Sequence, residues 1–330
     1  MTSTVPAEWA PHRALWLGFP SDGSLWLDDL EPARAEVAGL ARALAGPGRE
    51  QVRLLVSGAE AAAAAQAALR QTPGVEIVPG KLGDIWLRDT GPIFFGDRAV
   101  GFQFNGWGGK YVLAGDEAVA AQLADNAGKP LTVWDYVLEG GALDHDGAGT
   151  VVTTRQCLLN PNRNASWTAA AAEQLLASAL GARKVLWLGD GLANDHTDGH
   201  VDNLARFVSP GVVVCPVAYG QGDVNAAAYD AAALALSGMS DADGRPLKVI
   251  RIPSPGLIED EDGKAIPASH MNFIIANGAV IMPDYGTPSA PLALGALRPL
   301  FPGREMIRLP SSAILTGGGS FHCITQQEPA

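Results

Sequence analysis

The sequence predicts an α/β protein built from about five similar units arranged radially around a centre. First, one pattern recurs at intervals of roughly 50 to 70 residues, too long for most solenoids: two apolar strands, a polar loop, an Ala/Leu helix and a closing strand. Second, turns such as Ser209-Pro210-Gly211 indicate hairpins between the first two strands. Third, neither GxGxxG nor a Walker sequence is present, which disfavours a doubly wound nucleotide-binding sheet. With 330 residues and 47% hydrophobic composition, the chain is long enough to bury a large core.

The third unit shows the pattern most clearly. Residues 149–159 read as a strand, and a polar loop follows. Ser166 stands where a helix N-cap belongs, and leucines and alanines then recur at helical spacing until Gly181 ends the helix. Residues 184–188 read as the closing strand.

The other units repeat this order. The first begins at Leu15. We expect strand pairs over 93–104, 204–217 and 272–282, helices near 32–45, 116–126, 225–236 and 289–297, and closing strands over 131–136, 248–252 and 305–309.

Charge and cysteine content narrow the function. Acidic residues outnumber basic ones by 35 to 23, a net charge of −12, which disfavours nucleic acid as a partner and suits a small cationic substrate. The start of the chain lacks the features of a secretory signal, and no apolar run reaches the roughly 18 residues of a membrane helix. Three widely spaced cysteines argue against a disulfide framework. We therefore expect a cytoplasmic protein that binds no membrane.

Five segments carry more polar residues and glycines than a core or an ordinary loop needs. Three of them have plain structural explanations when judged alone: a surface ion pair at Arg88-Asp89, a packed turn, and a solvated Glu139. The segments are 86–92, 104–110, 139–141, 195–203 and 315–325.

The fourth segment combines histidine with carboxylates. His200 and Asp202 are two residues apart, which would place both on one face of an extended segment. His196 and His200 have the spacing of zinc ligands on a helix, but Gly199 interrupts it and no HExxH glutamate is present. We therefore expect no metal site.

The fifth segment contains the candidate nucleophile. Cys323 follows a glycine-rich turn among polar residues, so we expect it to be exposed enough to react, whereas Cys157 and Cys215 read as buried core residues.

A thiol with an imidazole suggests covalent catalysis. A papain-like protease would not need the further carboxylates Asp89, Glu139, Asp198 and Asp202. Several carboxylates around a thiol fit a planar guanidinium, whose N–H donors they match in pairs.

These segments resemble the agmatine deiminase/peptidylarginine deiminase family. The matching stretches span nearly the whole chain: Trp86 to Pro92 (WLRDTGP), Asn105 to Lys110 (NGWGGK), Glu139 to Gly141 (EGG), Cys157 to Asn164 (CLLNPNRN), Thr197 to Phe207 (TDGHVDNLARF) and Gly317 to Gln327 (GGGSFHCITQQ), with Pro6-Ala7-Glu8-Trp9 at the start.

The resemblance implies a five-bladed α/β propeller (pentein) of ββαβ-type repeats around a pseudo-five-fold axis, with residues 1–330 forming a single catalytic domain. It also implies hydrolysis of agmatine to N-carbamoylputrescine and ammonia, without metal or organic cofactor. Homo-oligomers are common in the family.

Site roles follow from the same resemblance. Cys323 would attack the guanidinium carbon to form an amidino-cysteine intermediate, while Asp89 and Asp202 hold the nitrogens. His200 would protonate the departing ammonia and then activate water, and Glu139 would orient His200.

The substrate pocket departs from the family pattern at one position. Trp86 is expected to line the pocket, but His196 stands where agmatine deiminases usually carry an acid four residues before the catalytic histidine. Asp195 and Asp198 are the nearby acids that could replace it, so the three residues 195, 196 and 198 are candidate contacts for the substrate tail.

Two other functions remain open. One is a deiminase of arginine or peptidyl-arginine, which an arginine or lysine beside Trp86 would favour because an α-carboxylate needs a cationic partner. The other is a non-catalytic binding protein on the same scaffold, because fold does not imply function.

Overall fold

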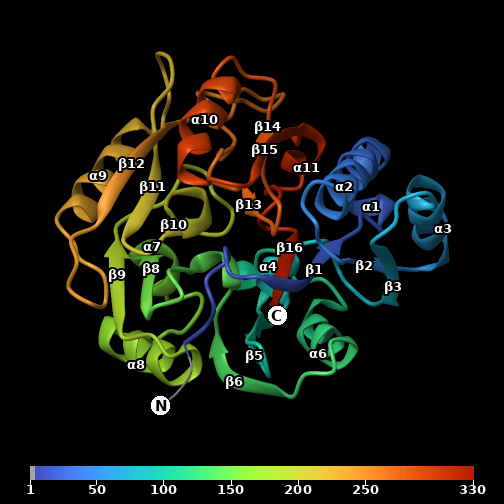
Figure 1. The fold of residues 1–330 in the computed structure, drawn as a ribbon, viewed down its shortest axis with the longest axis horizontal. Coiled ribbons are helices and arrows are strands. Elements are labelled where there is room, and N and C mark those ends of the chain that lie inside the picture. The colour runs from blue at the N-terminus through green and yellow to red at the C-terminus, as the bar shows by residue number, and fades with distance from the viewer. Residues whose placement is uncertain (1–3) are drawn as a thin grey trace.

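The computed structural model describes residues 4–330 and shows five small β-sheets in a ring (Figure 1). Four sheets have three strands and one has four. The colours of the ribbon pass around the ring in order from the first unit to the fifth, so each unit is continuous in sequence apart from one strand. The predicted number of repeats is confirmed.

Units two to five share one topology. Their first two strands pair antiparallel, and the second and third pair parallel across a helix. The elements are β4 (Ile93–Phe94), β5 (Ala99–Gln103), α6 (Asp116–Asn126) and β6 (Leu131–Val137); β7 (Asp144–His145), β8 (Thr150–Thr154), α8 (Ala169–Leu180) and β9 (Lys184–Leu188); β10 (Arg206–Ser209), β11 (Val212–Val217), α9 (Ala226–Ser237) and β12 (Lys248–Pro253); β13 (Ile274–Ile275), β14 (Ala279–Asp284), α10 (Ala290–Leu297) and β15 (Glu305–Pro310).

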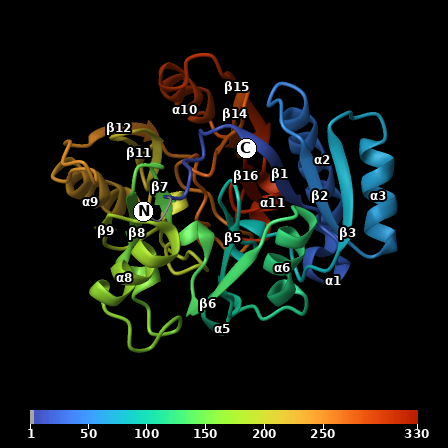
Figure 2. The same cartoon turned by 60° about the horizontal axis from the view of Figure 1, so that its bottom comes forward.

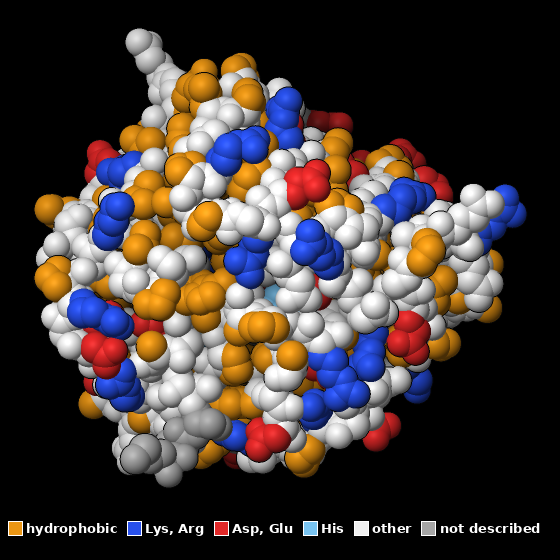
Figure 3. All heavy atoms as spheres, in the orientation of Figure 1, with side chains coloured by type: hydrophobic (Ala, Val, Ile, Leu, Met, Phe, Trp, Pro, Cys, Tyr) orange, Lys and Arg blue, Asp and Glu red, His pale blue; other side chains and the backbone are white. Residues whose placement is uncertain are grey.

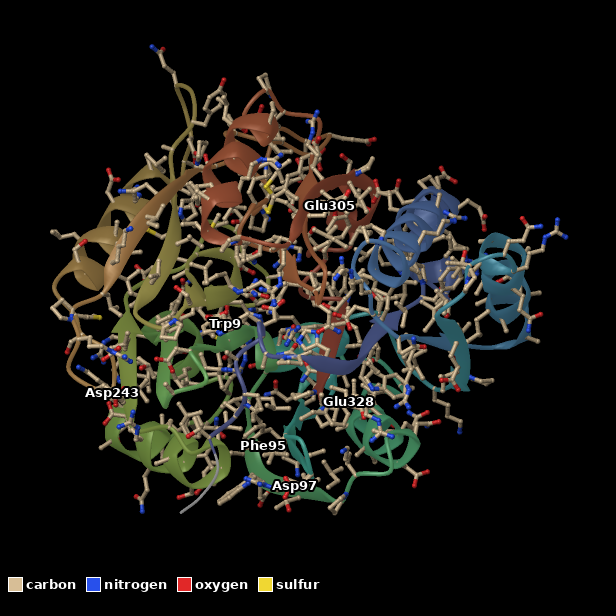
Figure 4. The ribbon with its side chains drawn as sticks, viewed as in Figure 1. Trp9, Phe95, Asp97, Asp243, Glu305 and Glu328 are labelled. Carbon is tan, nitrogen blue, oxygen red and sulfur yellow. The ribbon has the colours of Figure 1, made fainter. Side chains whose placement is uncertain are left out.

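The first unit is completed by the end of the chain. Its sheet has the order β16-β1-β2-β3, and the last strand runs antiparallel to the first. Glu328 on β16 is fully buried and pairs with Arg53 on β2 at 2.9 Å; Figure 4 shows Glu328 near the centre of the ring. The elements are β1 (His12–Gly18), α2 (Leu30–Ala45), β2 (Val52–Ser57), α3 (Ala59–Leu69), β3 (Val75–Gly80) and β16 (Thr325–Pro329).

Each crossover helix packs an apolar stripe against its sheet. The helices α3, α8 and α9 lie at the periphery in both ribbon views (Figure 2). In α6, Val119 and Leu123 are fully buried one helical turn apart, as an amphipathic helix requires. The strands thus lie between an outer layer of helices and the centre of the ring.

The boundaries of the third unit differ from the prediction in two places. Thr168, not Ser166, caps α8, because its side chain accepts a hydrogen bond from the backbone N–H of Ala171 at 3.2 Å. The strand predicted over 149–159 ends at Thr154, whose hydroxyl accepts from the N–H of Cys157 and starts a short helix. Gly181 ends α8 as predicted, in the left-handed conformation with φ of 70°.

Short helical turns make up much of the remaining regular structure, and several carry the polar segments described above. They are α1 (Gly23–Trp26), η1 (Leu27–Asp29), α4 (Leu87–Thr90), α5 (Gly106–Gly109), η2 (Gly140–Ala142), α7 (Arg155–Leu158), η3 (Val201–Asn203), η4 (Arg298–Leu300) and α11 (Ser312–Thr316).

Surface charge and helix hydrophobicity indicate whether the chain has a charged binding face or a membrane helix. On the face shown in Figure 3, acidic and basic side chains are interspersed rather than gathered by sign. Across residues 4–330, none of the helices combines the length and apolar character needed to cross a bilayer.

Candidate active site

A cleft of about 910 Å³ contains the thiol of Cys323 in its wall. Trp86, Asp89 and Trp107 line the same cleft, so segments that are far apart in sequence meet there. Trp86, which the family resemblance assigns to the substrate pocket, lines this cleft.

Cys323 is almost completely buried in the wall of the cleft. Only 6% of the residue is accessible, because Asn272 and the glycine-rich turn enclose it, but Cys323 still lines the cleft. The Asn272 amide donates to the Cys323 sulfur at 3.1 Å, and its oxygen accepts from the Cys323 N–H at 3.2 Å. Burial, followed by the charges of Asp202 and Asp89, raises the pKa of the Cys323 thiol well above its usual value.

Asp202 lies beside the thiol. Its Oδ2 is 3.5 Å from the Cys323 sulfur and 2.8 Å from Nδ1 of His322, whereas its Oδ1 accepts no hydrogen bond from any described residue. Asp202 is fully buried, and burial raises its pKa to about 7 despite the opposing charge of His200. A buried carboxylate oxygen without a donor is a natural acceptor for a cationic ligand.

Asp89 is anchored on both oxygens. The indole N–H of Trp107 donates to Oδ2 and the backbone N–H of Gly141 to Oδ1, each at 2.9 Å. A side chain at Gly141 would place its Cβ 2.5 Å from Nδ1 of His200 and 2.8 Å from Asp89, so glycine permits this close approach. The surface ion pair considered for Arg88 and Asp89 is wrong, because both residues are buried and their side chains bind different partners.

His200 lies beside Asp89, in the loop that leads into the first strand of the fourth unit. Its Nδ1 lies 3.7 Å from Asp89 Oδ1, and neither ring nitrogen has a hydrogen-bond partner among the described residues. The expected extended segment is wrong, because His200 precedes η3 and Asp202 lies within that turn. Burial lowers the pKa of His200, but the charge of Asp89, with Cys157 and Glu139, outweighs it and raises the pKa well above the usual value.

Glu139 and Cys157 lie on the other side of His200. Their oxygen and sulfur and a ring nitrogen of His200 all lie within 4.8 Å of one another. These donor types could ligate zinc, but Arg163 Nε donates to Glu139 at 2.7 Å, and its cation opposes a second positive charge there. Cys157 is buried as predicted, although its sulfur contributes to this polar group as well as to the core.

Comparisons with known proteins identify the fold and the family. The model of the Porphyromonas-type peptidyl-arginine deiminase family matches residues 4–329. The chain belongs to this family. An agmatine deiminase of Stutzerimonas stutzeri is 38% identical over 99% of this chain and 95% of its own length. One of Ectopseudomonas mendocina is 36% identical with the same coverage.

Solved structures agree with the predicted architecture. The agmatine deiminase of Enterococcus faecalis superposes with a TM-score of 0.90 at 33% identity, covering 99% of this chain and 95% of that one. DDAH from Pseudomonas aeruginosa superposes with a TM-score of 0.54 at 13% identity over 96% of this chain and 99% of that one, and so shares the fold alone. The five-bladed α/β propeller is confirmed.

Of the three residues expected to contact the substrate tail, one lines the cleft and two do not. His196 is exposed and lines the cleft, where the Tyr111 hydroxyl lies 3.3 Å from its Nδ1. Asp195 accepts from the N–H and hydroxyl of Thr197 at 2.8 and 2.6 Å. Asp198 pairs with Arg163 and, at 2.6 Å, with Lys110. Both acids are thus engaged by the protein, and neither lines the cleft.

An aspartate between two tryptophans forms part of the wall that sequence reasoning missed. Asp84 accepts from the indole N–H of Trp26 at 2.9 Å and of Trp86 at 2.8 Å, and the two indoles stack with centroids 6.2 Å apart. A Cβ on Gly317 would lie 2.7 Å from Trp26 and 2.8 Å from Trp86. The glycine-rich turn thus lets the backbone before Cys323 pack on this aromatic wall.

Asn272 and His322 were also missed. Asn272 reads as the start of a strand, and its contact with the sulfur spans 51 residues, which no local pattern reveals. His322 could have drawn attention as a histidine adjacent to the candidate nucleophile.

Proposed function

We propose that this chain hydrolyses the guanidinium group of agmatine, giving N-carbamoylputrescine and ammonia through an amidino intermediate on Cys323. One observation carries the proposal: the Cys323 thiol lies 3.5 Å from the buried Asp202 and shares a cleft with Asp89. Two carboxylates beside a sulfur match a planar cation whose carbon the sulfur attacks. In this proposal the described chain forms a single catalytic domain, because its first and last strands share one sheet.

The free thiol is protonated at neutral pH, since burial and both carboxylates raise its pKa. A guanidinium bound between Asp202 and Asp89 offsets their charge, so substrate binding favours loss of the thiol proton to solvent. The thiolate then attacks the guanidinium carbon and forms a carbon–sulfur bond.

His200 handles the protons of the next two steps. Its raised pKa supplies an imidazolium that protonates one amino nitrogen, the carbon–nitrogen bond breaks and ammonia leaves. Neutral His200 then takes a proton from water as the oxygen attacks the amidino carbon. The carbon–sulfur bond then breaks and releases the thiolate of Cys323, the attached hydroxyl loses its proton to solvent to form the carbonyl, and the product keeps the second amino nitrogen as a ureido group.

The charge of the cleft favours agmatine over arginine. Among its described lining residues, Lys264 is the one lysine or arginine, and the position beside Trp86 is taken by Asp84. An α-carboxylate would meet acids there, whereas the amine of agmatine would be attracted. The acidic lining residues are Asp28, Asp29, Asp84, Asp89, Glu259, Asp260 and Glu261.

The test compares agmatine, arginine and arginine peptides by kcat/KM in the wild type and in Cys323→Ser. We expect agmatine to be the best substrate, an amidino adduct on Cys323 in samples quenched during turnover, and no ammonia release by the variant. Cys215→Ser is the matched control, because Cys215 is fully buried in the core of the fourth unit. Full activity of Cys323→Ser would eliminate the covalent mechanism, and preference for arginine would eliminate agmatine as the substrate.

A further inference from the structure

His322 is adjacent to the candidate nucleophile, but its side chain does not line the cleft. The imidazole instead lines a separate small cavity together with Glu8, Arg88 and His145. From there Nδ1 reaches Asp202 Oδ2 at 2.8 Å, and both residues are buried. The imidazole thus approaches Asp202 from outside the substrate cleft.

The protonation of this pair follows from its surroundings. Burial, followed by the positive charges of Arg206 and Arg88, lowers the pKa of His322 well below its usual value, so the imidazole is neutral. A neutral ring carries one N–H. Once Asp202 is ionised, its carboxylate can only accept, and the proton of His322 therefore lies on Nδ1.

The backbone fixes the direction of this hydrogen bond. The N–H of His322 donates to Asn272 Oδ1 at 2.8 Å, and its carbonyl accepts from Arg88 Nε at 3.3 Å. On the far side of the ring, Nε2 lies 3.8 Å from Glu8, which pairs with Arg206. The imidazole is therefore held on several sides while it contacts Asp202.

We infer that His322 is a positioning residue that anchors Oδ2 of Asp202 through Nδ1–H and leaves Oδ1 free to accept from the guanidinium. This inference rests on the proposed function, since it assigns Asp202 to the substrate. The Cys323 thiol reaches the same Oδ2 only at 3.5 Å, so the imidazole makes the shorter contact. A donor to the charged form also keeps Asp202 ionised at lower pH.

Charged groups around His322 and Asp202 also affect the pKa values of these two residues, so the test must leave those groups unchanged. Asp202 is influenced by His200, Asp89, Arg206 and Asp195 as well as by Cys323. His322 is influenced by Arg206, Arg88, His145 and His200, and it faces Glu8 and Asp202. Substitutions at position 322 alone leave all of these groups unchanged.

The experiment compares His322→Asn with His322→Gln. The amide nitrogen of asparagine falls near the position of Nδ1, whereas that of glutamine falls near Nε2, and both side chains are polar and similar in size. With the guanidino compound that the wild type hydrolyses fastest, we expect His322→Asn to keep kcat/KM within a few-fold. We expect His322→Gln to lose about 10- to 100-fold, as loss of a hydrogen bond to a charged group implies.

The pH profile separates positioning from a merely structural role. In His322→Gln the acidic limb of kcat/KM should move to higher pH, because Asp202 loses a donor to its ionised form. In His322→Asn the limb should stay at its wild-type position. Thermal melts of both variants serve as the folding control.

Different results would contradict the inference about His322 and the proposed function. Equal activities and identical acidic limbs in the two folded variants would overturn the inference about His322. Absence of turnover with every guanidino compound in the wild type would overturn the proposed function itself, and with it the inference.

Discussion

At the scale of single residues, the site is a set of buried charges whose pKa values depend on one another. Asp202 and Cys323 each oppose ionisation of the other, because both would be negative in a buried position. Such an arrangement is unfavourable until a cation enters, so it favours binding of a positively charged ligand.

Thiol reactivity tests this coupling directly. Removing the charge in Asp202→Asn should lower the pKa of Cys323, so the free variant should react faster with iodoacetamide at pH 8 than the wild type does. The rate is followed by mass spectrometry of the modified peptide. Asp198→Asn, which removes an acid that does not line the cleft, should leave the rate near the wild-type value. A slower reaction of Asp202→Asn would contradict the coupling.

The aromatic wall makes a separate prediction. Asp84→Asn keeps one acceptor oxygen for two indole N–H groups, so Trp26 and Trp86 lose part of their anchoring. We expect KM for agmatine to rise about five- to tenfold with a smaller change in kcat, since about 1 kcal/mol of hydrogen bonding is lost away from the reacting carbon. Asp28→Asn removes an exposed cleft carboxylate without touching either indole. An equal rise in KM in both variants would indicate a charge effect instead of a positioning effect.

At the scale of elements, short turns position the site and regular helices stabilise the units. Asp89 lies in α4, Asp202 in η3, and Cys323 follows α11 and a glycine turn. Two crossover helices hold these turns in place: Glu36 on α2 accepts from the N–H groups of Ala313 and Ile314 in α11, and Asp116 on α6 accepts from the N–H groups of Gly83 and Asp84.

The N-cap of α8 is the clearest element-scale test. Thr168→Ala removes the acceptor for the N–H of Ala171 and should lower the free energy of unfolding by about 1 kcal/mol, with kcat/KM unchanged. Urea unfolding measures the first quantity and an ammonia assay the second. Thr168→Ser keeps the hydroxyl and should stay close to the wild type; loss of stability in Thr168→Ser equal to that in Thr168→Ala would show that the cap is not the cause.

Sequence periodicity determined the helices more reliably than the strand ends. The bounds of α6 and β9 agree with the expectation because apolar spacing and flanking turns mark them. The prediction was wrong at Thr154, which ends β8 and caps α7 through its side chain, and at Thr168, which takes the cap position of α8 that was assigned to Ser166. Capping depends on where a hydroxyl points, which spacing alone does not determine.

At the scale of the whole molecule, the ring is closed by β16 against β1. This closure buries Glu328 beside Arg53, and a buried carboxylate that loses its partner is costly. The first and last segments of the chain therefore depend on each other for stability.

Removing one member of this pair should show that dependence. We expect Arg53→Ala to lower the free energy of unfolding by about 2 to 3 kcal/mol, somewhat less than a fully buried pair because Arg53 is partly exposed. In the double variant Arg53→Met, Glu328→Met, much of this loss should return, because no unpaired buried charge remains; Arg13 and Glu76, which also contact this pair, are exposed to solvent. Urea unfolding of both proteins measures the effect. A double variant less stable than Arg53→Ala would show that the ion pair does not account for the loss.

The amino-acid sequence by itself determined the repeat number, the order of the elements and the segments that carry polar chemistry, because periodicity and turn residues are local properties. Only the tertiary structure decided that Asn272 touches the sulfur, that Asp84 joins two tryptophans, that Asp195 and Asp198 are engaged inside the protein, and that His322 contacts Asp202. These contacts join residues from different units or from the two sides of one turn. They exist because ring closure buries polar groups at the centre, where each must find a partner or await a ligand.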